Sequence, residues 1–164
     1  MAVDHASSEF RVEKARVNAV VTLAHGDSHE GHFFVATGGA HCSGPELVGD
    51  LLNAEPGFFP FELHDAPANR TVLYNRREVV MVALPENEAS RVPGYDVAPE
   101  RYVSVRLSHG GRVAGAVRVY RPTGHVRLSD WARNADIFRY IETGETTLLV
   151  NMAHVIEISE VPKP

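Results

Sequence analysis

A chain of 164 residues that is 44% hydrophobic and 23% charged has the composition of a folded protein, which excludes a largely disordered one. Its formal net charge of −5 offers no overall attraction to nucleic acid or to an anionic membrane. No apolar run reaches the roughly 18 residues that a membrane-spanning helix needs, and the one cysteine, Cys42, excludes an internal disulfide.

The first segment, residues 1–16, is interpreted as an N-terminal extension. It lacks the apolar centre of a signal peptide, so we expect a cytoplasmic protein, and the single cysteine is compatible with a reducing compartment. Within this extension, residues 9–16 fit either a short helix or an added strand.

An internal repeat is the strongest signal in the sequence. The order of apolar residues, glycines and aspartates recurs along the chain, with two four-residue deletions where loops are expected. We therefore predict a first repeat at residues 17–84, a linker with three prolines at 85–100, and a second repeat at 101–162. The aligned segments are 21–35 with 105–119, 50–62 with 130–142, and 71–79 with 147–155.

Each repeat begins with a predicted hairpin, because apolar and polar residues alternate on both sides of a glycine-containing turn. Keeping the apolar residues on one face pairs His25 with His29 and His109 with Val113, which leaves three-residue loops. These loops span 26–28 and 110–112.

The same register places Leu23 opposite Gly31 in the first repeat and Leu107 opposite Gly115 in the second. A glycine inside a strand usually marks a bend or a close approach of another backbone segment, so we expect strongly coiled hairpins. We also expect four leucines to be buried at matching places: Leu23, Leu107, Leu73 and Leu149.

A short helix is predicted after each hairpin, at residues 51–54 and 131–134. Asp50 and Asp130 precede these segments and can accept hydrogen bonds from the first free amides. Two strands and a closing strand follow in each repeat. Asn75 and Asn151 end the middle strand before a tight turn, and we expect structural roles for both amides.

Residues 105–117, VRLSHGGRVAGAV, resemble the first signature of the Sm-like fold, and residues 149–156, LVNMAHVI, resemble its second signature. The first repeat carries both less clearly, as VTLAHGDSHEGHFFV and LYNRREVVMV. The resemblance implies a mainly β chain of two tandem Sm-like or SH3-like small barrels, each of about five strands with a short inserted helix. The spaced pattern Leu128-Ser129-Asp130, Leu149-Val150-Asn151 and Val155 also resembles bacterial proteins of unassigned activity.

The Sm-like fold includes the bacterial RNA-chaperone ring, and its RNA binders use a polar loop after the second strand to hold a base and its sugar. The corresponding loops here, TGGA at residues 37–40 and RPTG at 121–124, do not fit that pattern. The resemblance therefore does not carry RNA binding over to this chain.

Four histidines, His25, His29, His32 and His41, lie close together in the sequence, with Cys42 beside the last. Imidazole and thiolate are good transition-metal ligands. The expected register brings only His25 and His29 together and sends His32 to the other face. We therefore interpret the pair as polar caps at a barrel rim, and we keep metal binding by the first hairpin as an alternative.

No catalytic constellation is recognisable, so we predict no enzyme and no cofactor. Cys42 and Ser43 lie near His41, but no positioned base and acidic orienter follow from the spacing. Asp50 and Asp130 might suggest a two-carboxylate site. They occupy equivalent places in separate repeats, so helix capping explains them better.

The two repeats differ in charge. Residues 17–84 hold three basic and eight acidic residues, whereas residues 101–162 hold eight arginines and six acidic residues. Arg106, Arg112 and Arg118 share the outward side of the second hairpin, which makes them a candidate interaction surface for carboxylate or phosphate. We expect them to be exposed and to have few acidic partners.

We favour a non-catalytic protein-interaction or assembly module whose partner is the same chain or another protein, because small barrels have edges that need neighbours. An RNA- or nucleotide-binding module that uses the arginine face is the first alternative, and a metal-binding protein is the second. We expect no membrane or DNA partner.

Overall fold

The computed structural model describes residues 13–38, 44–65, 67–120 and 127–164. The first half contains β1 (Lys14–Leu23), β2 (Ser28–Ala36), α1 (Val48–Ala54), β3 (Phe58–Leu63), β4 (Arg70–Asn75), the 3₁₀ turn η1 (Arg76–Glu78) and β5 (Val79–Leu84). Two 3₁₀ turns follow, η2 (Glu88–Arg91) and η3 (Tyr95–Val97). The second half contains β6 (Glu100–Leu107), β7 (Arg112–Arg118), α2 (Leu128–Ala132), β8 (Phe138–Glu142), β9 (Thr147–Asn151), η4 (Met152–His154) and β10 (Val155–Glu160).

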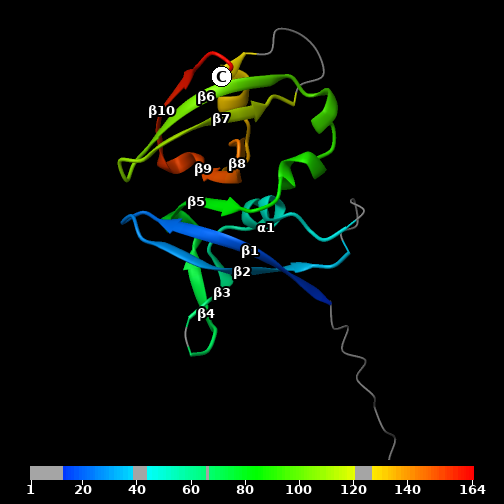
Figure 1. The fold of residues 1–164 in the computed structure, drawn as a ribbon, viewed down its shortest axis with the longest axis vertical. Helices are drawn as coiled ribbons and strands as arrows, with labels where there is room; N and C mark the ends of the chain where they lie inside the picture. Colours follow the sequence, from blue (N-terminus) through cyan, green and yellow to red (C-terminus); the bar gives the residue numbers. More distant parts are fainter. Residues whose placement is uncertain (1–12, 39–43, 66, 121–126) are drawn as a thin grey trace, which may run out of the picture.

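The described strands form one antiparallel sheet in the order β10-β6-β7-β8-β9-β5-β1-β2-β3-β4. The mainly β class is therefore confirmed, and the two halves contribute five neighbouring strands each in the same relative order. The expected pair of separate closed barrels is not observed. The sheet is open and continuous, because β9 of the second half pairs with β5 of the first, where the halves meet in Figure 1.

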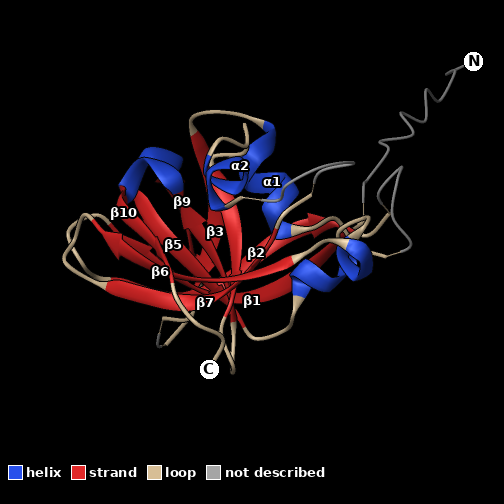
Figure 2. Cartoon of the chain, turned by 90° about the horizontal axis from the view of Figure 1, so that it is seen from above, coloured by secondary structure: helices blue, strands red, loops and turns tan. Residues whose placement is uncertain are grey.

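The two short helices lie on the same side of the strands, as Figure 2 shows. None of the helices in the described ranges is long and apolar enough to cross a membrane. The predicted N-terminal extension is described only from residue 13 onward, where β1 begins almost at once, so residues 14–16 are strand and not helix.

The hairpins have the predicted side-chain parity but a different register. His29 pairs with Val21 and Val113 pairs with Val105, in place of the predicted His25 and His109. The loops still contain three residues, but they lie two positions earlier than predicted. Their bounds follow from the bonds that close them, from Leu23 N to Asp27 O and from Leu107 N to Gly111 O.

The turn glycines explain this difference. Gly26 and Gly110 have φ angles of 100° and 95°, a region that L-residues with side chains rarely adopt. Each therefore occupies the last loop position, where a left-handed residue closes a three-residue hairpin. The sequence interpretation had placed each glycine first in its loop, which moved the register by four residues.

The strand glycines mark close backbone approaches, as predicted, although their partners are Ala19 and Val103 and not the leucines. A Cβ on Gly31 would lie 2.1 Å from the carbonyl oxygen of Glu62, and a Cβ on Gly115 would lie 2.4 Å from that of Glu142. At both places the second strand of the half bends so closely over the third that only a hydrogen fits.

Two apolar cores lie on the two sides of the β5–β9 contact. Three of the four predicted core leucines, Leu23, Leu107 and Leu149, are buried, as expected. The prediction for Leu73 is wrong, since its side chain is 65% exposed. Leu73 belongs to β4, which is the last strand of the sheet, whereas its counterpart Leu149 belongs to β9, which has a neighbour on each side.

The helix caps also differ from the prediction. α1 begins at Val48, so Asp50 lies within its first turn and is not the capping residue. The free amides of Val48 and Gly49 instead donate to the buried carboxylate of Glu88, at 2.9 and 3.0 Å. Asp130 lies in the first turn of α2, where its Oδ2 accepts a 3.1 Å bond from the Arg127 amide. The segment predicted as a linker thus caps the first helix.

Replacing either strand glycine with alanine is expected to destabilise the fold. Gly31→Ala and Gly115→Ala should each lower the free energy of unfolding by about 1–3 kcal/mol, because the added methyl group meets backbone that cannot rotate away. Gly144→Ala is the matched control, since nothing lies within 4 Å of its added Cβ. Urea denaturation measures all three, and equal stabilities would contradict the close approach.

Candidate functional site

The contact between β5 and β9, which we call the seam, joins the two halves by strand pairing. Its paired residues are Met81 with Val150, Val82 with Leu149, Ala83 with Leu148 and Leu84 with Thr147. Side chains cross the seam in both directions. Phe138 and Leu149 of the second half lie in the apolar core of the first half, and Val80 of the first half lies in the core of the second.

Asn151 holds the end of the seam. Its Nδ2 donates to the carbonyl oxygens of Val79 and Arg76, at 2.8 and 3.2 Å, and its Oδ1 accepts from Ala153 N at 2.9 Å. The structural role predicted for Asn151 is therefore confirmed, with a buried amide that bonds only to backbone. The left-handed backbone is not used, since its φ is −75°.

Asn75, the counterpart of Asn151, caps its own turn in the same way but has no seam to hold. Its Oδ1 accepts from Arg77 N at 3.1 Å. Its Nδ2 has no hydrogen-bond partner among the described residues, and the side chain is only partly buried. The two asparagines thus differ because β9 has a neighbouring strand beyond it and β4 has none.

Other polar contacts cross between the halves. Asn53 of α1 pairs with the Phe138 backbone, accepting from its N–H at 2.8 Å and donating to its oxygen at 2.9 Å. His154 Nε2 donates to the Arg77 oxygen at 2.7 Å. Tyr140 donates to Glu88 Oε1 at 2.7 Å. Burial and the adjacent Glu88 raise the pKa of Tyr140 well above its usual range, so this hydroxyl stays a donor.

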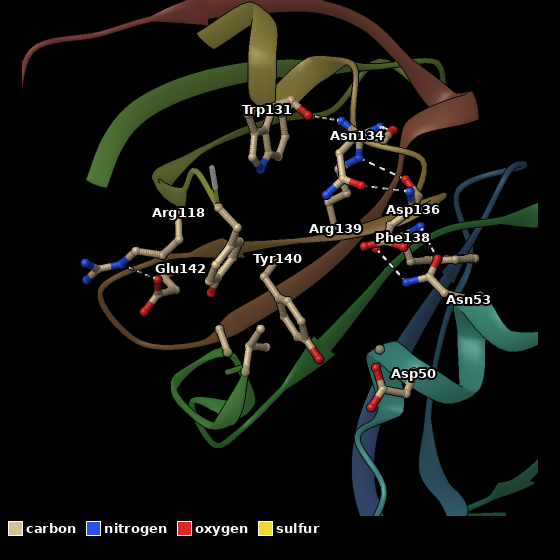
Figure 3. A pocket seen from close by; sticks show the side chains of 14 residues that line it. Asp50, Asn53, Arg118, Trp131, Asn134, Asp136, Phe138, Arg139, Tyr140 and Glu142 are labelled. Atoms are coloured by element: carbon tan, nitrogen blue, oxygen red, sulfur yellow. Dashed lines mark hydrogen bonds and ion pairs between the residues drawn. The ribbon is translucent and has the colours of Figure 1, made fainter. Parts of the chain in front are cut away.

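A small pocket of about 140 Å³ lies between α1 and the second half (Figure 3). Asp50, Tyr120 and Tyr140 are among its lining residues. Burial and the carboxylates of Glu46 and Asp136 raise the pKa of Asp50, and burial raises the pKa of Tyr120 to about 12. Neither change produces a nucleophile with a base beside it. The guanidinium of Arg139, on the same wall, donates to three backbone oxygens, those of Asp136, Trp131 and Asn134.

A larger hollow of about 700 Å³ opens beside the seam, where η1 and η4 face the segment that precedes β8. Arg76 forms part of its wall, but the guanidinium donates to the carbonyl oxygens of Phe58 and Leu51 and lies over the Phe59 ring. Burial also lowers the pKa of Arg76. This arginine is therefore a structural clamp between α1 and β3.

The three arginines of the predicted interaction surface do not form one open patch. Arg106 pairs with Glu157 at 3.2 Å, and Arg112 donates to Ser104 at 3.1 Å. Arg118 lies at the far end of β7, where it contacts Glu100 at 2.9 Å, Glu142 at 3.5 Å and the Tyr95 ring. Arg118 thus has two acidic partners and Arg106 has one, so the expectation of few acidic partners is wrong for Arg118. Arg106 faces Arg112 across the hairpin.

The histidines of the first hairpin are not grouped as a metal site. His25 is exposed and pairs with Asp27 at 3.0 Å, while His29 lies against the Tyr74 ring. Across the described part of the chain, no three His, Cys, Asp or Glu side chains are placed to hold a metal ion together. His41, Cys42 and Ser43 lie outside the described residues.

Sequence reasoning missed the exposed apolar side chains near the two outer edges of the sheet. Phe58 and Leu73, on β3 and β4, are 63% and 65% exposed, whereas their counterparts Phe138 and Leu149 are 2% and 0% exposed. At the other end of the sheet, Ile156 of β10 is also exposed. The apolar pattern of the two repeats is the same, so the difference comes from position in the sheet and could not be read from either repeat alone.

Comparison of the chain with families of related proteins, with curated proteins and with solved structures found no match.

Removing the two asparagine side chains should have unequal effects. Asn151→Ala is expected to lower the free energy of unfolding by about 2–4 kcal/mol, because it removes three hydrogen bonds, including the buried one to the Val79 oxygen. Asn75→Ala removes only a turn cap and should cost about 1 kcal/mol. Chemical denaturation at low protein concentration measures both, and equal losses would contradict the distinct role of Asn151 at the seam.

Proposed function

We propose that the chain is a non-catalytic assembly module in which β4 of one copy pairs with β10 of the next. The observation that carries this proposal is the pair of exposed apolar side chains, Phe58 and Leu73, at places where the second half inserts Phe138 and Leu149 into a core. We take the partner to be a second copy of the chain. Its β10 corresponds by the repeat to β5, the strand beside which Leu149 is buried.

The seam provides the geometry for the proposed contact. Transferring its register to the repeat-related positions sets Leu73 opposite Ile158, and Tyr74 opposite Glu157, of the neighbouring copy. Leu73 then faces the core that Ile158 already borders, as Leu149 faces the core around Val82. The free amide of Asn75 would meet the backbone where η4 leads into β10, in the way that Asn151 meets η1.

The charged side chains of the two edge strands are already engaged within the chain. Arg70 at the start of β4 pairs with Asp65 at 3.1 Å, and Glu157 and Glu160 of β10 pair with Arg106 and Arg101. The proposed contact therefore rests on apolar side chains and backbone pairing.

An apolar strand at the end of a sheet presents unpaired backbone groups and attracts further strands. β4 contains Thr71, Val72, Leu73 and Tyr74 without an interrupting charge or proline. Head-to-tail contacts of this kind generate a closed ring if the rotation closes and a filament if it does not. The Sm-like resemblance belongs to this proposal as its fold assignment, and the hairpins bent at Gly31 and Gly115 support it.

Disrupting the β4 surface should dissociate the assembly and leave the monomer folded. Leu73→Asp places a charge where the proposal requires an apolar contact, so we expect the mass to fall to the 18.0 kDa of one chain. Sedimentation velocity over a range of protein concentrations measures this change. The matched control is Val97→Asp, which makes the same kind of change at an 85% exposed residue of η3, outside both edge strands.

Two outcomes would contradict the proposal: a wild-type chain that is monomeric at all concentrations, or a Leu73→Asp variant that keeps the wild-type mass. Binding of labelled RNA, weakened steeply by salt, would favour the nucleic-acid alternative. In that case Arg112→Glu, which changes the least engaged of the three hairpin arginines, should weaken the binding.

A further inference from the structure

The outer strand β10 carries an apolar side chain whose counterpart in the first half is buried across the seam. Ile156 of β10 is 56% exposed, whereas Val80 of β5 is 0% exposed. Each is the second residue of its strand, and the two strands correspond by the repeat. Val80 lies in the core of the second half, although its strand belongs to the first. Ile156 is thus placed like a seam residue, but on a strand at which the sheet ends.

The first core is incompletely covered at β4. Val72 and Tyr74 pack against this core but are only partly buried. Their counterparts in β9, Leu148 and Val150, are 8% and 0% exposed and lie with Val80 in the second core. The difference follows from strand order, because β5 covers β9, whereas β4 is the last strand of the sheet. A strand placed beside β4 as β5 lies beside β9 would complete the first core.

We propose that Ile156 enters the first core of the next copy, beside Val72 and Tyr74, so that each contact between copies exchanges apolar side chains in both directions. This inference rests on the assembly proposed above, in which Phe58 and Leu73 supply the opposite direction. Each chain then has two different surfaces, the β4 surface (Phe58 and Leu73) and the β10 surface (Ile156). They lie at opposite ends of the sheet (Figure 1), so one kind of surface binds the other in a head-to-tail contact.

One residue of β10 departs from the pattern of the seam. Glu157 occupies the place where β5 has Met81, and Met81 packs against the second core. The Glu157 side chain is 48% exposed and pairs with Arg106 at 3.2 Å. A charged side chain on the end strand of a sheet opposes pairing with a further strand. Glu157 therefore acts against Ile156, and the contact between copies is weaker than the seam that it resembles.

A pair of variants tests the two surfaces separately. Ile156→Asp changes only the β10 surface and Leu73→Asp only the β4 surface, so each variant alone should sediment as a single chain of 18.0 kDa. An equimolar mixture should form a complex of twice that mass and no larger species, because each partner retains one intact surface. Both side chains are exposed in the single chain, so the monomer should stay folded. Circular dichroism of each variant checks this.

Glu157→Met tests the same surface by strengthening it. It should tighten self-association of the full chain by about 10–100-fold, because it places an apolar side chain where the seam has one. Loss of an exposed ion pair costs little stability. Sedimentation equilibrium measures the dissociation constant. The matched control is Glu30→Met, which changes an exposed glutamate on β2, a strand with a neighbour on each side, and should leave the constant unchanged.

The outcomes distinguish this inference from the assembly itself. A wild-type chain that is monomeric at all concentrations overturns both. If the wild type assembles and Leu73→Asp dissociates it, the assembly stands, but an Ile156→Asp variant that keeps the wild-type mass shows that β4 pairs with another β4 and overturns the role of Ile156. The inference is also overturned if the mixed variants stay monomeric, or if Glu157→Met associates no more tightly than the wild type.

Discussion

Antiparallel pairing of β5 with β9 makes one sheet out of two five-stranded units, and both apolar cores depend on it. A unit of about 60 residues buries a smaller fraction of its surface than a larger domain does, and it is marginally stable alone. Here each core contains side chains of the other half. Phe138 and Leu149 are buried in the first core, and Val80 is buried in the second. The two cores are therefore completed together, and neither half is a full domain by itself.

The segment between the halves adds to this dependence. Glu88 is a buried carboxylate with three donors, the amides of Val48 and Gly49 and the hydroxyl of Tyr140. A buried charge that keeps such partners is tolerated, whereas one that loses them is strongly destabilising. Glu88 thus connects α1 of the first half to β8 of the second, and the segment predicted as a linker is a structural part of the interface.

Side-chain parity, strand content and the placement of bends could be predicted from the sequence, because a period of two residues and an interior glycine have local causes. The hairpin register could not, since it depended on which loop position Gly26 and Gly110 occupy. Leu73 and Leu149 show a second limit. Their local sequences are alike, and only the order of strands in the sheet decides that one is exposed and the other buried.

The candidate sites were predictable to different degrees. The hairpin arginines were expected to be free, but Arg118 is enclosed by Glu100 and Glu142, which lie on the neighbouring strands β6 and β8. Ile156 was not singled out in the sequence interpretation, because it shares its place in the repeat with Val80 and differs in exposure through strand order. Asn151 was identified correctly, since a turn cap is a local feature, but its hold on the other half was not.

The covalent connection between β5 and β6 has a thermodynamic consequence. It keeps β9 permanently near β5, so the seam forms at a fixed effective concentration, whatever the amount of protein in solution. The proposed contact between β4 and β10 of separate chains would have no such tether, and its occupancy would follow mass action. In the proposed assembly, one strand-pairing geometry would be a constitutive part of the fold at one position and a concentration sensor at the other.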